Sequence, residues 1–323
     1  MDERQQAQLA IHLPNLIAYG KQVLGQPAEL HRLEVTKLTG GYGVQAPYRI
    51  NQSFRSAEGQ FQTVPVVQKR VDETETQVMR ALQEVPDAGA LPYVIDLFAD
   101  EQATGPEENA MYWLVTPFYQ GAALTFDDEI PAAVIESLAR VHVHFASRLA
   151  LFDGLSGLHR VDAPFFQRTV NNALEALALA SPKHTGMAEC NKRLEKIGQL
   201  SVFEQVLQRL PVTLVHGDVH PGNIIRSPEG ESVLIDWGNA RIAPAMLDLA
   251  NVVTLGSDSW AAYFSTWEKA GGPPLDPAQI RREYDWAVAM VNLQYLPFAA
   301  AYRNENVPKM VERILDARDR LKA

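Results

Sequence analysis

The stretch from Leu214 to Asp236 reads LVHGDVHPGNIIRSPEGESVLID. Short apolar runs alternate in it with polar turns that contain proline and glycine, a pattern typical of short buried strands joined by tight turns. We expect these turns to bring the chain back so that Asp236 lies near Asp218 and Asn223. The stretch would then carry one carboxylate, one amide and a second carboxylate on one small scaffold.

These three side chains suit the transfer of a phosphoryl group. In such reactions a carboxylate orients the attacking hydroxyl, while an amide oxygen and a second carboxylate hold the magnesium ions that bridge the phosphates. The spacing from Asp218 to Asn223 matches the D-x-x-x-x-N pattern of kinase catalytic loops. A single aspartate is more often a turn former or a strand-end cap. The combination of motifs, with an apolar strand that ends in Asp236-Trp237-Gly238, favours catalysis.

The same motifs resemble the signature of a known family. His216-Gly217-Asp218, Asn223 and Asp236-Trp237-Gly238 look like the HGD…N…D signature of aminoglycoside phosphotransferases and their relatives, the choline, homoserine, methylthioribose and fructosamine kinases. The resemblance implies an α+β, protein-kinase-like fold with two lobes. Residues 1–119 would form an N-terminal nucleotide-binding lobe with an antiparallel sheet, and residues 120–323 a mainly helical C-terminal lobe for catalysis and substrate binding.

The resemblance also implies roles and cofactors. Asp218 would be the catalytic residue, and Asn223 and Asp236 would bind Mg2+. The phosphate donor would be ATP, with GTP left open. The partner would be a small molecule that carries a hydroxyl group.

A glycine-containing segment, Thr39 to Val44, separates two strand candidates at residues 32–38 and 48–54. Gly41 and Gly43 would permit a close approach of the backbone to phosphates, but glycines serve plain hairpin turns equally well. Both interpretations stay open.

A lysine lies near the end of the third strand candidate, residues 61–71. Val66-Val67-Gln68-Lys69 resembles the V-A-I-K strand of kinases, which implies that Lys69 contacts the α- and β-phosphates of the nucleotide. In the helix predicted over residues 73–84, Glu75 shares the apolar stripe that faces inward. We therefore expect Glu75 to pair with Lys69, with Glu73 as the alternative.

Two more strand candidates, residues 91–97 and 111–117, complete the sheet of the first lobe. The segment Pro117-Phe118-Tyr119-Gln120-Gly121 resembles the hinge between kinase lobes, where backbone groups are expected to bind adenine. Pro117 has no N–H group, so Tyr119 is the better donor. A simple connector is the alternative.

The rest of the chain is predicted to be mainly helical. Apolar residues at helical spacing predict helices over residues 3–20, 128–149, 171–180, 188–210, 246–255, 260–270, 277–298 and 307–321. His142 and His144 are not separated by a metal-ligand interval, so we expect both to be structural. Pro244 and Asp248-Leu249-Ala250 resemble an element of the small-molecule kinases in which the aspartate braces the catalytic loop.

Composition limits the partners and the location. A length of 323 residues suits two lobes, and a net charge of -10 argues against a nucleic-acid partner. The single cysteine, Cys190, excludes an internal disulfide framework and fits a reducing compartment. The N-terminus lacks the pattern of a signal peptide, and no segment is long and apolar enough to cross a bilayer. We expect a cytoplasmic protein without a nucleic-acid or membrane partner, and we make no prediction of its oligomeric state.

Together these features predict an ATP- and Mg2+-dependent kinase of a small hydroxylated compound. The alternative from another class is a catalytically silent nucleotide-binding scaffold of the same fold, against which the complete set of motif residues argues. A protein kinase is disfavoured because Gly217 replaces the arginine of HRD, and because residues 238–248 are too few for an activation segment.

The sequence bears on the acceptor less directly. The resemblance offers aminosugars, amino alcohols and sugars. Acids lie among aromatic residues in the C-terminal half, at Asp258, Glu283 and Asp285. Such a neighbourhood favours a cationic or amine-bearing acceptor, through charge pairing and cation–π contact. Nearby arginines count against it, namely Arg241, Arg281 and Arg282.

Overall fold

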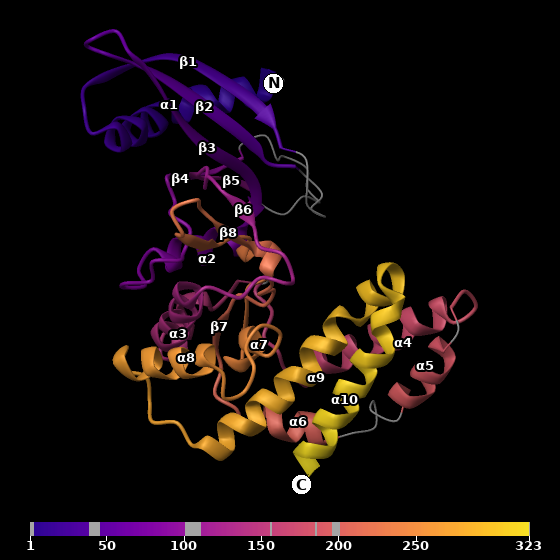
Figure 1. Cartoon of the computed structure of the whole chain (residues 1–323). Coiled ribbons are helices and arrows are strands. Elements are labelled where there is room, and N and C mark those ends of the chain that lie inside the picture. The colour runs from indigo at the N-terminus through magenta and orange to yellow at the C-terminus, as the bar shows by residue number, and fades with distance from the viewer. Residues whose placement is uncertain are drawn as a thin grey trace. The chain divides into compact units, whose positions relative to one another are not determined.

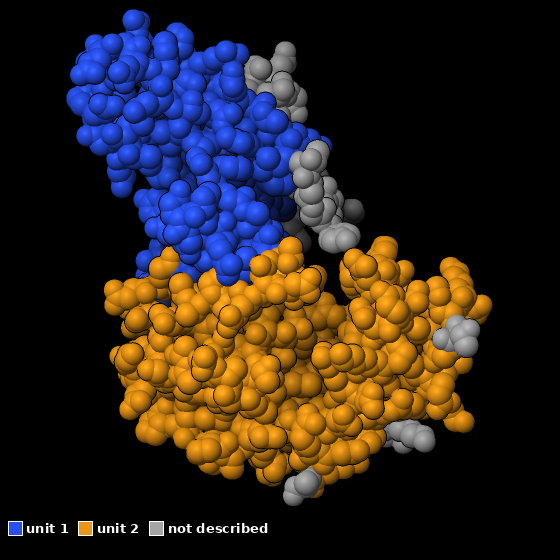
Figure 2. Space-filling view, in the orientation of Figure 1, with its two compact units in different colours: residues 1–85, 90–124, 224–238 blue, residues 86–89, 125–223, 239–323 orange. Residues whose placement is uncertain are grey.

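The computed structural model describes residues 3–38, 46–100, 111–155, 157–184, 186–195 and 201–322, with the backbone alone for residues 3–11 and 201. The chain divides into two compact units, coloured separately in Figure 2. Unit 1 comprises residues 1–85, 90–124 and 224–238, and unit 2 comprises residues 86–89, 125–223 and 239–323. The stretch quoted above is therefore divided between the units after Asn223.

Unit 1 is built on a five-stranded antiparallel sheet in the order β1-β2-β3-β5-β4 (Figure 1). Its strands are β1 (Ala28–Lys37), β2 (Tyr48–Ser56), β3 (Phe61–Asp72), β4 (Asp96–Ala99) and β5 (Met111–Pro117). Two helices belong to the unit, α1 (Glu3–Leu24) and α2 (Glu73–Leu82), which follows β3 directly. Leu16 of α1 packs in one core with Ile50 and Val66 of the sheet. The antiparallel sheet predicted for the N-terminal part is thus confirmed.

A second, three-stranded sheet of unit 1 lies directly before one of the predicted site residues, Asp236. It contains β6 (Ala122–Ala123), β8 (Ile224–Arg226) and β9 (Ser232–Leu234), and β8 and β9 form an antiparallel hairpin. The backbone N–H of Leu234 donates to the carbonyl of Ala90 at 2.9 Å, which fastens the hairpin to the rest of the unit. Asp236 follows β9 after one residue.

Unit 2 is mainly helical, as the sequence predicts. Its helices are α3 (Ala132–Ala146), α4 (Ala163–Ala180), α5 (Met187–Glu195), α6 (Ser201–Leu207), α7 (Met246–Leu249), α8 (Asp258–Lys269), α9 (Pro277–Tyr302) and α10 (Val307–Lys322). A short antiparallel ladder joins β7 (Thr213–Val215) to β10 (Arg241–Ala243). The long helix α9 packs against α4, α7 and α10, and Trp286, Leu293 and Leu296 on it are fully buried. Single 3-10 turns are η1 (Leu149–Phe152), η2 (Pro221–Asn223), η3 (Trp237–Asn239) and η4 (Asn304–Asn306). In the part of the chain that the structure describes, each helix is too short or too polar to span a bilayer.

Several helices of unit 2 differ from the predicted helices in where they begin or end. The helix predicted from residue 171 begins at Ala163, because the Asp162 carboxylate accepts a hydrogen bond from the N–H of Phe165 at 2.8 Å and Pro164 suits the first turn. The helix predicted from residue 128 begins only after Pro131. The prediction over residues 188–210 corresponds to two helices, α5 and α6, with residues 196–200 outside the described part.

The strand predicted over residues 91–97 begins only at Asp96. The side chain of Gln83 takes the backbone groups that a longer strand would use, because its amide donates to Pro92 O at 3.0 Å and its Oε1 accepts from Val94 N–H at 3.1 Å. The side chain of Gln83 thus forms hydrogen bonds with the backbone of this segment. A strand pattern in the sequence cannot reveal such an interaction.

Candidate active site

Lys69 lies on β3 and forms two ion pairs within unit 1. Its Nζ donates to Glu75 Oε1 at 3.0 Å and to Asp236 Oδ1 at 2.6 Å. Glu75 lies in the first turn of α2, which the Asp72 carboxylate caps by accepting from the N–H of Glu75 at 2.8 Å. The pair of Lys69 and Glu75 expected from the helix phase is present, whereas Glu73 is exposed.

The three groups tune one another electrostatically. Burial lowers the pKa of the Lys69 ammonium, but the carboxylates of Glu75 and Asp236 raise it by more, so the pKa lies above its ordinary value. Burial raises the pKa of Glu75, although Lys69 opposes this shift. Lys69 is therefore a fixed positive charge at neutral pH, able to contact an anionic ligand.

Asp236 has a left-handed backbone conformation with φ +65°, which aspartate tolerates better than most residues. Trp237 holds the turn, because its buried indole donates to the carbonyl of Leu234 at 3.1 Å. A Cβ on Gly238 would lie only 3.1 Å from Glu75 Oε2, so a glycine fits this close approach. The DWG sequence thus fixes the Asp236 carboxylate beside Lys69 with half of its side chain exposed (50%).

Asp218 follows β7 on a loop of unit 2. Its Oδ1 accepts a hydrogen bond from the hydroxyl of Tyr295, and its Oδ2 accepts one from Asn239 Nδ2 at 3.3 Å. The N–H of Asp218 donates to Nδ1 of His216 at 3.2 Å. One fifth of its side chain is exposed (20%), so the carboxylate is both fixed and reachable.

The orientation of the Asn223 side chain is set by a hydrogen bond to the same loop. Its Nδ2 donates to the carbonyl of Asp218 at 3.0 Å, which makes Oδ1 the amide atom that can serve as a metal ligand. Amide and carboxylate oxygens are ligands that Mg2+ accepts, so the residue types of Asn223 and Asp236 fit this ion. Asn223 belongs to unit 2 and Asp236 to unit 1, and a metal shared by them stays a prediction.

Asp248 on α7 braces the loop that carries Asp218. This buried carboxylate accepts from the N–H of His216 at 2.7 Å, from the N–H of Gly217 at 2.8 Å and from His142 Nε2 at 3.1 Å. Burial raises the pKa of Asp248, but His142 and the backbone donors lower it by more, so the group is ionised. The other ring nitrogen of His142 contacts the Tyr263 hydroxyl at 2.8 Å. The structural roles predicted for Asp248 and His142 are confirmed.

Two residues of α9 that carry no motif support the same loop. Gln294 Nε2 donates to the carbonyl of Gly217 at 3.2 Å, and its Oε1 accepts from the guanidinium of Arg241 at 3.1 Å. Tyr295 donates to Asp218, and burial together with that carboxylate raises its pKa, so the hydroxyl stays protonated. Both lie 77 residues from their loop partners, and the sequence offered no signal that would have found them.

The structure says less about the nucleotide-binding roles predicted for Gly41, Gly43, Pro117 and Tyr119. Gly41 and Gly43 lie outside the described residues. Pro117 ends β5. The Tyr119 hydroxyl accepts from the N–H of Tyr93 at 2.8 Å, and burial raises its pKa to about 12. An adenine contact by the backbone of Tyr119 stays a prediction.

Two of the three acids that were expected to attract a cationic acceptor have other partners, whereas Asp258 is exposed in the first turn of α8. Glu283 is buried and accepts from the N–H of Met246 at 3.0 Å. Asp285 is buried and pairs with Arg320 at 2.6 Å, while Trp286 is fully inaccessible. The packing of α7 and α10 on α9 explains this burial. Glu283 and Asp285 therefore support the helix packing and give no argument for a cationic acceptor.

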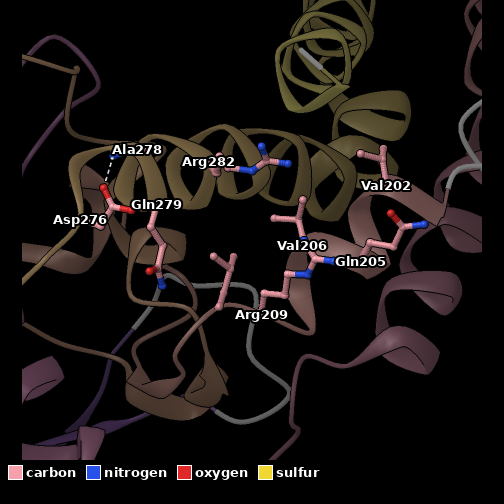
Figure 3. Close-up of a pocket in the computed structure, with 9 residues that line it drawn as sticks. Val202, Gln205, Val206, Arg209, Asp276, Ala278, Gln279 and Arg282 are labelled. Atoms are coloured by element: carbon pink, nitrogen blue, oxygen red, sulfur yellow. Dashed lines mark hydrogen bonds between the residues drawn. The ribbon is translucent and has the colours of Figure 1, made fainter.

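A cavity of about 340 Å³ lies between α6 and the first turns of α9 (Figure 3). Arg209 and Arg282 line it, and Asp276 at its edge accepts from the N–H of Ala278 at 3.0 Å. One guanidinium nitrogen of Arg282 donates to the carbonyl of Leu321 at 3.3 Å. The cavity shares no lining residue with the Asp218 loop or with the α9 residues that contact it.

Comparison with known proteins adds a family and a fold. The sequence profile described as the phosphotransferase enzyme family matches residues 65–288, a span that contains the lysine, the HGD motif and the DWG motif. Among curated proteins, no sequence matches the chain.

Solved structures of similar fold cover nearly the whole chain. A putative aminoglycoside phosphotransferase from Ralstonia eutropha has a TM-score of 0.55 and 16% identity, over 95% of this chain and 98% of its own. A mutant aminoglycoside 2'-phosphotransferase-IIIa in its GDP complex has a TM-score of 0.51 and 15% identity, over 94% and 97%. Choline kinase from Cryptosporidium parvum has a TM-score of 0.51 and 12% identity, over 90% of each chain. The α+β, protein-kinase-like fold is thereby confirmed.

Proposed function

This chain belongs to the phosphotransferase enzyme family, as a small-molecule kinase, and we propose that it transfers the γ-phosphate of ATP to a hydroxyl of a small molecule with the help of Mg2+. The GDP complex of the aminoglycoside 2'-phosphotransferase-IIIa mutant, which has a similar fold, supports a nucleoside triphosphate as the donor. A cytoplasmic location, and lobes divided at residues 119 and 120, stay predictions.

In the proposed reaction the acceptor oxygen attacks the γ-phosphorus, the bond to the β–γ bridging oxygen breaks, and ADP leaves. Asp218 orients the acceptor hydroxyl and takes up its proton. Lys69 contacts the phosphates and Glu75 fixes Lys69. Asn223 and Asp236 are the residues that would hold Mg2+, which neutralises phosphate charge when it is bound.

The observation that carries this proposal is the position of Lys69 between two carboxylates. Its ammonium is bonded to Glu75 and to Asp236 at once. Placing a lysine between a buried glutamate and an exposed aspartate has no evident use for stability alone, because an apolar side chain in the same volume would avoid the cost of burying charge. The arrangement suits a phosphate site, where Lys69 would contact the phosphates and Asp236 would be a ligand of Mg2+.

The silent scaffold remains the alternative of another class. A silent scaffold would bind the nucleotide without transferring phosphate. In this chain, however, Asp248 and Tyr295 of α9 fix the loop and the carboxylate of Asp218, which stays partly exposed. Such support for a carboxylate with no part in nucleotide binding favours an enzyme.

The direct test is ADP release coupled to a spectroscopic readout, with MgATP and a library of hydroxyl compounds. We expect at least one acceptor class to give ADP together with a product heavier by one phosphoryl group, and Asp218→Asn to remove both signals. Tight MgATP binding without ADP release from any compound would favour the silent scaffold. Replacing ATP by GTP in the same assay identifies the donor.

A further inference from the structure

A buried carboxyl group that the proposed reaction does not use lies on α9, at Glu283. Its side chain is 6% exposed, and Oε1 accepts a hydrogen bond from the N–H of Met246 at 3.0 Å. The N–H of Ala245 also bonds to this carboxylate. Among the residues that the structure describes, no cationic side chain pairs with it. Two backbone donors at the start of α7 are thus the described partners of Glu283.

Helix α7, which packs against α9 (Figure 1), has no cap of its own. It is a single buried turn, and its N-cap residue, Ala245, has no side chain that could accept a hydrogen bond. Glu283 supplies the missing acceptor from 37 residues away. The position of α7 therefore depends on this carboxyl group of α9.

The same turn of helix links Glu283 to the catalytic loop. Asp248 lies in the turn that begins at Met246, and it accepts from the N–H groups of the two residues that precede Asp218. A displacement at the start of so short a helix also moves Asp248. Hydrogen bonds thus connect Glu283 to the loop of Asp218 within unit 2 alone.

Capping α7 does not by itself require a charge. The amide oxygen of a glutamine could accept from the same N–H groups, and it would avoid the cost of burying an ion without a cation. A carboxylate forms stronger hydrogen bonds with N–H donors than a neutral oxygen does. The charge of Glu283 therefore lowers stability but holds α7 more firmly, a combination that is expected where a site must be fixed.

The groups around Glu283 leave its carboxyl close to neutral-pH titration. From α8, burial raises the pKa of the Tyr263 hydroxyl, and Glu283 and Asp248 add to the shift, so the hydroxyl stays protonated. The charge of α10 is directed elsewhere, since Arg320 pairs with Asp285, and the described side chains that α4 and α6 bury are apolar. Burial raises the pKa of Glu283 to about 7, although the two backbone donors oppose this shift.

We propose that Glu283 is a positioning residue of the kinase: as a carboxylate it holds α7 and Asp248 so that the catalytic loop presents Asp218 to the acceptor hydroxyl. This inference rests on the proposed function and adds a control of the same site from α9. Protonation weakens the hydrogen bonds to α7 and loosens the loop. Turnover should therefore rise as the pH increases through about 7, while the stability that Glu283 contributes falls.

Glu283→Gln separates this role from a structural one, because glutamine keeps the shape and an acceptor oxygen but stays neutral. Asp285→Asn is the matched control, a buried acid of the same helix that pairs with α10. The rate of ADP release from MgATP is measured from about pH 6 to about pH 8, with water alone and with each hydroxyl compound that supports turnover.

At about pH 8 we expect the kcat of Glu283→Gln to be about fivefold below that of the wild type, the difference between a charge-assisted and a neutral hydrogen bond. At about pH 6 the two rates should be equal, because the wild-type carboxyl is then protonated. The KM for MgATP should not change, since Lys69 and Asp236 belong to unit 1. Asp285→Asn should follow the wild-type pH profile.

Amide hydrogen exchange followed by mass spectrometry gives a readout that does not depend on catalysis. At about pH 8 the N–H groups of His216 and Gly217 should exchange faster in Glu283→Gln than in the wild type, although removal of the buried charge makes the variant the more stable protein. A glutamate that only affected stability would give slower exchange and an unchanged kcat.

The outcomes distinguish this inference from the proposed function. Equal or slower exchange of the two loop amides in Glu283→Gln, or a kcat profile parallel to that of the wild type, overturns the positioning role while the kinase stands. No ADP release from any compound, water included, overturns the kinase and with it the part of Glu283 in catalysis.

Discussion

The Gly217→Ala substitution tests how closely the catalytic loop is packed. Gly217 has φ +79°, and a Cβ there would lie 2.3 Å from the carbonyl oxygen of Asn239 and 2.6 Å from Nε of Arg241. The loop cannot move away easily, because Asp248 holds the N–H of Gly217 and Gln294 holds its carbonyl. The same crowding explains why the arginine that protein kinases carry at this position has no room here.

The expected loss of stability has two parts. A left-handed conformation costs about 1–2 kcal/mol for alanine relative to glycine. Forcing a methyl group into a packed site adds about 1–3 kcal/mol. We therefore expect Gly217→Ala to lower the free energy of unfolding by about 2–5 kcal/mol.

Gly271 provides a matched control, since its φ is +78° and a Cβ at this position would have no neighbouring atom within 4 Å. Gly271→Ala should carry the conformational part alone, about 1–2 kcal/mol. The assay is urea unfolding followed by tryptophan fluorescence on both variants and the wild type. Equal losses in the two variants would refute the packing argument.

Three further outcomes are expected. Asp248→Asn should destabilise the protein by about 2–4 kcal/mol in urea unfolding, because an amide has one acceptor oxygen and turns its NH2 toward a buried N–H donor; unchanged stability would contradict the brace. Burial raises the pKa of Glu283 from 4.5 to about 7, so its contribution to stability is full below about pH 4.5 and is lost as the pH rises through about 7. Glu283→Gln should therefore differ little from the wild type at about pH 5 and be more stable by about 3 kcal/mol at about pH 8, and parallel pH profiles would refute this. Asp236→Ala should abolish Mg2+-dependent nucleotide binding in a titration with MgATP, whereas wild-type affinity would leave Asp236 as a strand-end cap.

The sequence predicted those parts of the site that depend on local pattern. Lys69 was predicted from the resemblance of its strand to the V-A-I-K strand of kinases and Glu75 from the phase of the next helix, and the two side chains do meet. Asp248 was recognised through a motif, and it does brace the loop. These residues were within reach because secondary-structure period and short motifs act over a few positions.

Contacts across the helical unit were beyond such reasoning. Tyr295 and Gln294 reach the catalytic loop only because α9 packs beside it, and neither residue type is distinctive on a helix. Glu283 and Asp285 were misjudged for the related reason that polar residues on a helix are usually solvated, whereas α9 is covered by its neighbours. Burial of a helix face is decided by tertiary packing, which a single sequence does not display.

The central claim is that Asp218 activates the hydroxyl of a small acceptor, and one comparison of kcat tests it directly. Asp218→Asn is measured in coupled ADP release against Asp276→Asn, which exchanges the N-cap of α9 for an equally good cap in the same unit. We predict that Asp218→Asn binds MgATP like the wild type but loses about 10²- to 10⁴-fold in kcat, the usual contribution of a general base, while Asp276→Asn stays at the wild-type rate. Turnover by Asp218→Asn at the wild-type rate would contradict the account.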